Sequence, residues 1–454
     1  MKTNSLHLVP DLNELLNEFG EDFSELSFCE GQKSGEITFE TEFRGEKRSD
    51  VYPFSYTDAI EKKRYEKRYA KMSLYKFLSE TLGKSLPWGA LTGVRPTKLA
   101  RQNFENLDGF FKNEMFVSEK KTELVKKILS VQDGVISKDN GAAHLFVSVP
   151  LCPSRCSYCS FISCEISKEK QVNEYIAALI DEIAHAKTLF SEYKSVYIGG
   201  GTPVAVTDTD FEKILSAVGK FDGEYTVEAG RPDAITEKKL DIMKRYGVTR
   251  VCVNPQTFCD KTLALIGRKH TAKDIFDSFA LVRSAGFSVN MDLIAGLPQE
   301  TFEDFKYSLD TAISLDPENI TVHTLALKSG SKLKESVDRI GGKVVSDMVD
   351  YAHDALDFAG YSPYYLYRQK YMAENLENTG YCKRGCECVY NIDIMEETAN
   401  VVACGANAIS KCVFKSDGGA EKIKRLGEPK DISAYLTRID EIKAEKEKLF
   451  TQNG

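Results

Sequence analysis

The sequence predicts an α/β fold: a partial barrel of six strand–helix units, preceded by an α+β domain and followed by an α+β extension. The first observation is that short apolar runs alternate with amphipathic stretches from His144 to about Leu327, as in a parallel sheet with crossover helices. The second is that a loop with three cysteines follows the first apolar run, and glycine-rich or charged motifs follow the later ones. Because sites in parallel sheets and barrels lie at the carboxyl ends of the strands, we expect one shared site there.

The length of 454 residues is enough for two or three domains. We expect an N-terminal α+β domain at residues 1–135, a core domain at 136–330 and a C-terminal domain that covers the substrate at 331–454. Hydrophobic residues make up 42% and charged residues 28% of the chain, which is typical of a soluble globular protein.

Composition also limits the cellular compartment and the classes of partner that we expect. No apolar run reaches the roughly 18 residues of a membrane span, and the first residues lack the layout of a secretory signal. We therefore expect a cytoplasmic protein without a membrane span. The twelve cysteines should then be reduced, so clusters of them indicate metal or redox chemistry before disulfides. The net charge of −8 argues weakly against a nucleic-acid partner.

Local patterns predict several elements in the first 135 residues. Asp11–Phe19 has the spacing of a short amphipathic helix, and Ile37–Phe43 alternates like a strand, with a hairpin turn at residues 45–47. Ala59–Leu82 reads as a basic helix with several tyrosines. Its charged face is either a surface for an anionic ligand or nucleic acid, or a solvated face beside an aromatic stripe on the core, which is the more frequent case.

Residues 87–101 read PWGALTGVRPTKLAR and combine the only tryptophan with Arg95, Lys98 and Arg101. Arginine forks match carboxylates, so such a loop could clamp an acidic ligand. Helix capping by Thr97 and plain packing are equally open alternatives.

The core consists of alternating strands and helices. The expected strands are His144–Pro150, Ser195–Ile198, Tyr225–Glu228, Arg250–Asn254, Ser288–Ile294 and Asn319–Leu325. The expected helices are Val172–Phe190, Phe211–Lys220, Glu237–Tyr246, Ala272–Ala285 and Phe302–Leu315.

Residues 146–161 read FVSVPLCPSRCSYCSF and place Cys152, Cys156 and Cys159 at C-x3-C-x2-C spacing. Thiolates select zinc or iron–sulfur clusters, and a closed zinc site needs four ligands, whereas no histidine follows nearby. A four-iron cluster held by three cysteines leaves one iron open to a small chelating molecule. Structural zinc, a disulfide or three unrelated core cysteines are the alternatives.

Polar motifs follow the later strands. The sequence Gly199-Gly-Gly-Thr-Pro203 allows close approach of the backbone to a ligand, but it lacks the GK[ST] ending of a nucleoside triphosphate loop. Singly, each charged or amide residue at a strand end would more often be a cap or a surface group, yet together they predict converging polar groups in one barrel mouth. These residues are Glu228, Gln256, Arg268 and Asp292.

The cysteine spacing with Tyr158 resembles the signature of radical S-adenosylmethionine (SAM) enzymes, whose open iron is chelated by the amino and carboxylate groups of SAM. The ordered phrases GGGTP, VEAGRP, RVCVNPQTF, IGRKH, NMDLIAGLP and CGANAIS are similar to the oxygen-independent coproporphyrinogen III oxidase family of radical SAM proteins. LTGVRPTK, VNPQTF and HTLALKSGS are similar to its HemZ-type coproporphyrinogen dehydrogenase branch, so the resemblance covers nearly the whole chain.

This resemblance implies a radical SAM barrel with a [4Fe-4S] cluster and SAM as cofactors. Cys152, Cys156 and Cys159 match the cluster ligands. The positions that hold the cluster-bound SAM match Gly200, Glu228 and Ile409. The positions that hold a second SAM in the enterobacterial enzyme match Tyr158, Gly201, Thr202, Gln256, Arg268 and Asp292.

Two positions depart from the family pattern. A tyrosine of the family is Phe146 here, and a histidine two residues further on is Ser148. Both changes remove polar contacts near the sulfonium of SAM. They leave open whether one or two SAM molecules bind and which substrate is oxidised.

The C-terminal region has patterns that suit a tetrapyrrole, which is a broad apolar disc with propionates. A helix is expected at Lys343–Phe358 and an aromatic strand at Tyr361–Tyr367, followed by the cations of Arg368 and Lys370. The tyrosines could form a wall over the disc, or they could be the core of a β-hairpin.

Further cysteines occur outside the first loop. Cys382, Cys386 and Cys388 lie in GYCKRGCEC, with Cys404 and Cys412 downstream, and their spacing matches no standard metal site. An auxiliary iron–sulfur or zinc site there is a minor alternative. The remaining cysteines read as core or incidental residues: Cys29, Cys164, Cys252 and Cys259.

By resemblance, the chain is an oxidoreductase of porphyrin and heme biosynthesis that removes hydrogen from the β-carbon of a propionate, releases CO2 and leaves a vinyl group, turning coproporphyrinogen III into protoporphyrinogen IX in two rounds. Its partners would be the tetrapyrrole and an electron donor such as flavodoxin or ferredoxin, and we expect a monomer. No catalytic side chain is assigned, and the final electron acceptor stays open. A heme chaperone of the same family is the second hypothesis, although VYNIDIMEE lacks the histidine of the chaperone motif near HNxxYW. A radical SAM enzyme acting on another tetrapyrrole is the third.

Overall fold

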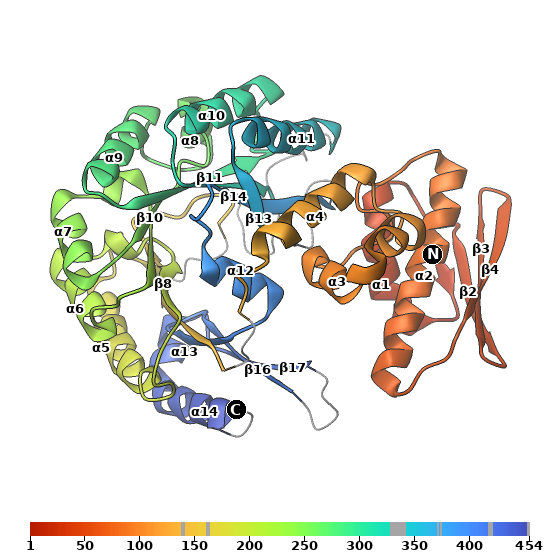
Figure 1. Cartoon of the computed structure of the whole chain (residues 1–454), viewed down its shortest axis with the longest axis horizontal. Helices are drawn as coiled ribbons and strands as arrows, with labels where there is room; N and C mark the ends of the chain where they lie inside the picture. The colour runs from red at the N-terminus through yellow and green to blue at the C-terminus, as the bar shows by residue number, and fades with distance from the viewer. Residues whose placement is uncertain are drawn as a thin grey trace. The chain divides into compact units, whose positions relative to one another are not determined.

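The computed structural model describes residues 1–137, 141–159, 164–326, 342–369, 372, 375–415 and 421–451 (Figure 1). The chain forms two compact units. Unit 1 comprises Met1–Leu129 and Tyr367–Glu377, and unit 2 comprises Ser130–Leu366 and Asn378–Gly454. Among the described helices, none combines the length and the apolar composition that crossing a membrane requires.

Unit 1 contains a four-stranded sheet with helices. The strands, in the order β1-β2-β3-β4, are β1 (Lys2–Thr3), β2 (Ser27–Lys33), β3 (Glu36–Phe43) and β4 (Glu46–Pro53). The helices are η1 (Leu6–Leu8), α1 (Val9–Phe19), α2 (Ala59–Leu82), α3 (Pro96–Gln102), η2 (Phe104–Asn106), the π-helix η3 (Gly109–Glu114) and α4 (Glu119–Gln132), whose last residues belong to unit 2.

The local sequence explains these elements. In α1 the buried residues recur at helical spacing, as Leu12, Leu15, Leu16 and Phe19. Between β3 and β4, Arg44 and Gly45 have φ of 53° and 85°, the two positive φ angles that a tight hairpin turn requires. The predicted helices, strand and hairpin of this region are therefore confirmed.

Unit 2 is built on an 11-stranded sheet in the order β13-β14-β12-β11-β10-β9-β8-β5-β15-β16-β17. Six neighbouring strands are parallel: β5 (Ala143–Val149), β8 (Ser195–Gly200), β9 (Glu224–Gly230), β10 (Arg250–Val253), β11 (Ser288–Ala295) and β12 (Asn319–Thr324). Their residues are buried almost without interruption, as expected for strands covered on both faces. The predicted partial barrel is confirmed.

Helices cover the outer side of this curved sheet (Figure 1). They are α5 (Glu169–Ala186), η4 (Pro203–Ala205), α6 (Asp208–Val218), η5 (Pro232–Ala234), α7 (Glu237–Tyr246), α8 (Asp260–Leu265), α9 (Ala272–Ser284), α10 (Phe302–Ser314) and α11 (Gly342–Phe358). Threonine caps set several starts, and Thr271 with Asp274 and Thr301 with Asp304 form complete capping boxes. The short strands β6 (Leu151–Cys152) and β7 (Cys164–Glu165) flank the cysteine loop.

The last part of the chain extends the same sheet at both edges. Its elements are β13 (Ser362–Arg368), β14 (Glu377–Cys382), α12 (Val389–Glu396), β15 (Asn400–Cys404), β16 (Ile409–Lys415), β17 (Glu421–Gly427), α13 (Ile432–Thr437) and α14 (Ile439–Thr451). β14 pairs antiparallel with β12, and β15 pairs parallel with β5. The strands β13 to β17 thus share a sheet with the core strands, and the expected division into three domains stays a prediction.

Candidate functional site

The cysteine loop follows β5 at the carboxyl end of the core strands. Cys152 and Cys156 are buried, Cys159 is partly exposed, and the backbone N–H of Cys159 donates to the carbonyl of Cys156 (3.1 Å). Every cysteine of the chain is a free thiol. Burial raises the pKa of Cys152 to about 11, because a thiolate loses its hydration there. A metal centre that binds this loop must therefore displace the thiol proton.

Among the described residues, no three histidine, cysteine or acidic side chains converge on a point that one metal ion could occupy. A four-iron cluster makes a different demand, because each cysteine binds a different iron atom. The three thiols lie on one loop and close enough that Cys156 and Cys159 raise the pKa of Cys152. This donor set fits a cluster.

The glycine-rich loop after β8 packs directly against the cysteine loop. The N–H of Gly201 donates to the carbonyl of Val149 (2.9 Å), and the N–H of Thr202 donates to that of Leu151 (2.8 Å). A Cβ atom on Gly201 would lie 2.6 Å from the carbonyl oxygen of Leu151, so only glycine allows this contact. The Thr202 hydroxyl lies 3.2 Å from Sγ of Cys152.

Glu228 lies at the end of the next strand, β9, and its carboxylate accepts a hydrogen bond from the Tyr197 hydroxyl (2.6 Å). Burial raises the pKa of Glu228 to about 7, the Tyr197 hydroxyl opposes the rise, and the charge of Asp292 adds to it. A Cβ atom on Gly199 would lie 2.9 Å from this carboxylate. The site thus contains a half-buried acid that can hold a cationic amino group.

Arg268 links the cysteine loop to the ends of β9 and β10. Its Nη1 donates to the Tyr158 hydroxyl (3.2 Å), and its Nη2 donates to the carbonyls of Asn254 (2.6 Å) and Gly230 (3.1 Å). The ring of Tyr158 packs against an apolar cluster that includes Ile266. Burial raises the pKa of the Tyr158 hydroxyl, so it remains a neutral donor.

Several buried polar atoms beside Arg268 have no hydrogen-bond partner. They are Oδ1 of Asn254, Oε1 of Gln256 and Nε of Arg268. Buried polar atoms in native proteins are nearly always satisfied, so this group fits a polar ligand that supplies the missing partners. Gln256 also has a left-handed backbone with φ of 68°, and its N–H donates to the carbonyl of Asp292 (2.9 Å).

The Asp292 side chain accepts a hydrogen bond from Asn290 (2.8 Å), and its other oxygen lies 3.8 Å from Nε2 of His323. Asn254, Tyr197 and His323 were not singled out in the sequence. Only their position at or near strand ends could have indicated them.

Phe146 and Ile409 differ in their surroundings. The Phe146 ring lies 6.2 Å from the rings of both Tyr197 and Tyr390, so it belongs to a buried aromatic stack. Ser148 donates to the carbonyl of Ala406 (2.8 Å). Ile409 begins β16 and is 50% exposed, which leaves its side chain accessible to a ligand but not packed in the site.

Other sequence-based hypotheses meet different outcomes. Arg368 is 1% exposed in unit 1, where its guanidinium donates to the carbonyls of Leu91 and Asn375 and lies over the Trp88 ring (5.2 Å). It is therefore a structural residue, and the hypothesis of a substrate clamp is wrong for it. Lys370 lies outside the described residues.

The stretch at residues 87–101 packs into unit 1. Trp88 is buried and donates to Glu377 (2.8 Å). The N-cap of α3 is Arg95, and no side-chain capping bond forms, so capping by Thr97 is wrong. Arg101 lines a surface pocket of about 530 Å³ with Phe104 and other residues. Roles of Arg95 and Lys98 in substrate binding stay predictions.

The C-terminal tyrosines are core residues. Tyr361, Tyr364 and Tyr365 are at most 5% exposed, which supports the hairpin-core alternative over an aromatic wall. Cys382 and Cys388 are buried too, and Cys388 lies 3.4 Å from a carboxylate oxygen of Glu224. These thiols have structural surroundings, and an auxiliary metal site there stays the minor alternative.

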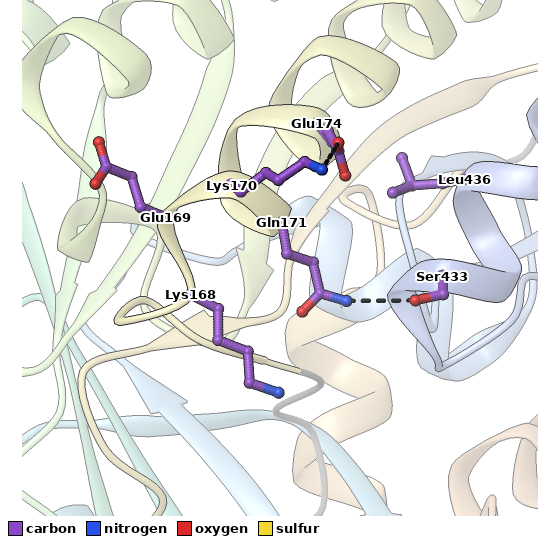
Figure 2. A pocket seen from close by; sticks show the side chains of 7 residues that line it. All are labelled: Lys168, Glu169, Lys170, Gln171, Glu174, Ser433 and Leu436. Carbon is purple, nitrogen blue, oxygen red and sulfur yellow. Dashed lines mark hydrogen bonds and ion pairs between the residues drawn. The ribbon is translucent and has the colours of Figure 1, made fainter.

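A surface pocket of about 430 Å³ lies at the first turn of α5 (Figure 2). Residues 168–171 and Glu174 line it with Ser433 and Leu436, and Gln171 donates to Ser433 (3.5 Å). Its lining mixes solvated charges of both signs, with Lys170 paired to Glu174 (3.9 Å). It offers no buried polar group for a ligand.

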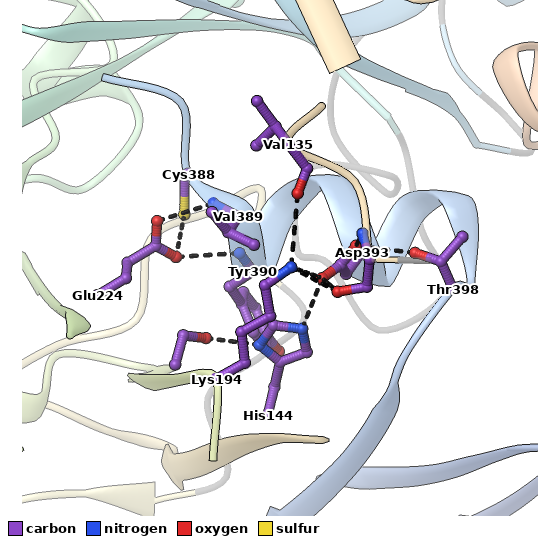
Figure 3. A network of polar contacts seen from close by, with 11 residues as sticks. Val135, His144, Lys194, Glu224, Cys388, Val389, Tyr390, Asp393 and Thr398 are labelled. Carbon is purple, nitrogen blue, oxygen red and sulfur yellow. Dashed lines mark hydrogen bonds and ion pairs between the residues drawn. The ribbon is translucent and has the colours of Figure 1, made fainter. Parts of the chain in front are cut away.

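Helix α12 closes the amino-terminal ends of the core strands (Figure 3). Glu224, at the start of β9, accepts hydrogen bonds from the N–H groups of Val389 (2.7 Å) and Tyr390 (3.0 Å). A carboxylate suits a helix start because the first N–H groups lack partners. One turn later, Asp393 accepts a hydrogen bond from Nε2 of His144 (2.9 Å). The candidate site lies at the opposite end of these strands.

Comparisons with known proteins agree with this geometry. Residues 146–312 match the Radical SAM superfamily. The oxygen-independent coproporphyrinogen-III oxidase-like protein HemZ of Bacillus subtilis is 35% identical over 396 residues, which cover 82% of this chain and 78% of that protein. The heme chaperone HemW of Bacillus subtilis is 36% identical over 192 residues, covering 40% of this chain and 50% of that protein.

Among solved structures, coproporphyrinogen III oxidase (HemN) from Escherichia coli, a radical SAM enzyme, has a TM-score of 0.54 at 21% sequence identity. The match covers 68% of this chain and 71% of that chain. At this identity the likeness shows a shared fold.

Proposed function

Because the chain belongs to the HemZ-like family of radical SAM proteins, we propose that it catalyses the oxygen-independent oxidative decarboxylation of coproporphyrinogen III to protoporphyrinogen IX. The family uses a [4Fe-4S] cluster and SAM. The observation that carries the proposal furthest is the extent of the match to the HemZ relative, 82% of this chain, since it includes both the core and the regions outside it.

In this proposal Cys152, Cys156 and Cys159 hold the cluster. The peptide group of Gly200, the carboxylate of Glu228 and the side chain of Ile409 hold the SAM bound to it. Support comes from the packing of Gly201 on Leu151, which brings the glycine loop against the cysteine loop, and from the half-buried carboxylate at the end of β9.

A second group of residues would hold a further polar ligand, which the family resemblance suggests is a second SAM. Gly201 and Thr202, which lie against the cysteine loop, belong to the same proposed group. Phe146 would supply apolar contact to SAM. The unpartnered atoms of Asn254, Gln256 and Arg268 support a polar ligand here. Other members of this group are Tyr158 and Asp292, which lie beside Arg268 and Gln256 respectively.

When bound, a reduced cluster and SAM supply a 5′-deoxyadenosyl radical that can take a hydrogen atom from a carbon atom. The protein then has to hold the propionate β-carbon near SAM and keep water away. Each propionate loses one hydrogen atom, one electron and CO2, so an electron acceptor is also required. The buried aromatic stack of Phe146, Tyr197 and Tyr390 supports exclusion of water below the site.

The test is product analysis. Protein reconstituted anaerobically with iron and sulfide should contain about four irons per chain, and with SAM, a reductant and coproporphyrinogen III it should yield protoporphyrinogen IX by mass spectrometry. A variant with Cys152, Cys156 and Cys159 replaced by Ala should lose both the irons and the reaction. Iron-loaded protein that cleaves SAM but leaves coproporphyrinogen unchanged would reject this substrate.

A heme-binding chaperone is the second candidate, because the HemW relative is 36% identical over its matched segment. Stoichiometric heme binding without turnover of coproporphyrinogen would favour it. Turnover of a different tetrapyrrole would favour another reaction of the same cofactors.

A further inference from the structure

Arg231 follows β9 and lies between the cysteine loop and solvent-facing Asp233. Its guanidinium is 4% exposed and forms a two-pronged ion pair with Asp233, with Nε and Nη2 donating at 2.9 Å and 2.8 Å. The remaining nitrogen, Nη1, donates to the Ser154 hydroxyl at 2.8 Å. Ser154 lies midway between Cys152 and Cys156. One side chain therefore connects the end of β9 to the centre of the cysteine loop.

The charges of this pair differ in their exposure to water. Asp233 is 34% exposed, so solvent screens its negative charge, whereas the guanidinium is buried. The positive end of the pair therefore faces the loop with little screening.

His270 completes the surroundings of the pair. Its Nδ1 lies 3.7 Å from Asp233, beyond hydrogen-bond length, and its side chain is fully buried. Burial lowers the pKa of His270, so the ring is neutral near pH 7 and leaves the net charge of the pair unchanged. Arg231 is thus a buried cation that contacts the cysteine loop at Ser154, whereas Arg268 contacts it at Tyr158.

We propose that Arg231 is a positioning residue that holds the cysteine loop through Ser154 and raises the reduction potential of the cluster, while Asp233 orients it and moderates its charge. This inference rests on the proposed cluster site. Reduction adds negative charge to the cluster, so a buried cation that contacts the loop between two of its ligands favours the reduced form.

The two members of the pair should shift the potential in opposite directions. Arg231→Gln removes the cation and should lower the equilibrium constant for reduction at least about tenfold, equivalent to about 59 mV for one electron. Asp233→Asn removes the opposing anion and should raise the potential. Arg245→Gln is the matched control, because Arg245 forms an exposed ion pair with Glu212 (2.6 Å) on the outer helices. Its potential should equal that of the unaltered protein.

The measurement is a redox titration followed by electron paramagnetic resonance, on reconstituted protein without SAM and with iron content determined for each variant. Opposite shifts support the proposal, because a merely structural role would not reverse sign. Unchanged potentials in both variants at full iron content would overturn it. Should Arg231→Gln fail to load iron, Arg231→Lys, which keeps the charge, should load it. If Arg231→Gln and Arg231→Lys lose iron equally and the potential of Asp233→Asn is unchanged, the proposal is also rejected.

Hydrogen exchange of the cluster-free protein tests the positioning part separately. Amides of residues 152–159 should exchange faster in Ser154→Ala and Arg231→Gln than in Arg245→Gln, and equal rates would refute the positioning role. A wrong cluster assignment would give a different result, because the variant that lacks Cys152, Cys156 and Cys159 would then keep its irons. If that variant loses its irons but the Arg231 and Asp233 variants have unchanged potentials, the cluster assignment holds and only the role of Arg231 is rejected.

Discussion

Glu228 is an acid whose charge state changes close to neutral pH. With its pKa raised to about 7, it is largely protonated in the free protein at lower pH. In the proposed site, binding of the SAM ammonium to this carboxylate would release a proton, so binding should weaken as the pH falls. We predict about a tenfold loss of SAM affinity from about pH 8 to about pH 6, measured by isothermal titration calorimetry under anaerobic conditions.

Glu228→Gln is the companion variant for this measurement. It keeps the shape of the side chain but removes the charge, so SAM affinity should fall about 10- to 100-fold, as expected for a charge-assisted hydrogen bond of about 1.5–3 kcal/mol. Its affinity should also lose most of its pH dependence. If SAM affinity depends on pH equally in Glu228→Gln and in the unaltered protein, the titrating group is not Glu228.

Cys382, Cys386 and Cys388 are predicted to be structural. Cys382 and Cys388 are buried beside the starts of the core strands, and the Cys386 carbonyl accepts hydrogen bonds from Arg250 (3.0 Å) and Asn319 (2.8 Å). Changing the three to Ser should leave the iron content and SAM cleavage nearly intact while lowering the thermal midpoint, because a buried hydroxyl costs about 1–3 kcal/mol without a partner. Loss of a whole cluster would instead establish an auxiliary site.

At the scale of elements, α12 depends on a buried acid. Asp393 accepts hydrogen bonds from His144, Ser137 and Thr398 and pairs with Lys194 (3.2 Å). These partners lower the pKa of Asp393, so its stabilisation is present above the ordinary carboxyl pKa and is lost as the pH falls below it.

Asp393→Asn should therefore reduce the free energy of unfolding by about 3–5 kcal/mol near pH 7, since it breaks a buried charged pair. The difference from the unaltered protein should shrink in acid. Chemical unfolding followed by circular dichroism checks both statements, with Asp277→Asn as control because Asp277 belongs to an exposed pair with Lys273. An equal loss at all pH values would contradict the charge-based explanation.

The elements differ in how well the sequence predicts them. Continuous apolar runs such as Arg250–Asn254 and periodic stretches such as Glu237–Tyr246 predict the core strands and helices within a few residues. α12 was missed, because VYNIDIME is apolar on most sides and buries both faces, so no amphipathic period marks it. The strands β15 and β16 were missed as well, since β16 pairs with β15 and β15 pairs with β5, which lies far away in the sequence.

The site follows the same division. Parallel topology brings strand-end residues such as Glu228 and Asp292 together, so their convergence can be predicted from order alone. Partners that depend on side-chain direction, including Tyr197 on Glu228 and Arg231 on Ser154, need coordinates. The sequence alone also cannot show whether an arginine binds substrate or is structural. The guanidinium of Arg368 donates its hydrogen bonds to carbonyl groups within unit 1, which only the structure reveals.

At the scale of the whole molecule, Arg368 is predicted to stabilise unit 1. It donates to the carbonyls of Leu91 and Asn375 and lies 3.8 Å from Glu18, and each of these groups would lose a buried partner on truncation. Arg368→Ala should lower the stability of unit 1 by about 3–5 kcal/mol, seen by calorimetry. SAM cleavage per folded molecule should persist. Arg44→Ala, which breaks an exposed pair with Glu21, should change stability little.

Unit 1 is assembled from two stretches of chain, residues 1–129 and 367–377, and this has a consequence for biosynthesis. While the ribosome makes the intervening residues, the pocket for Arg368 around Trp88 and Leu91 stands open. At about 5–20 residues per second, that interval lasts about 10–50 s. The nascent N-terminal part must therefore survive unfinished, exposed to chaperones and proteases, until its last piece emerges.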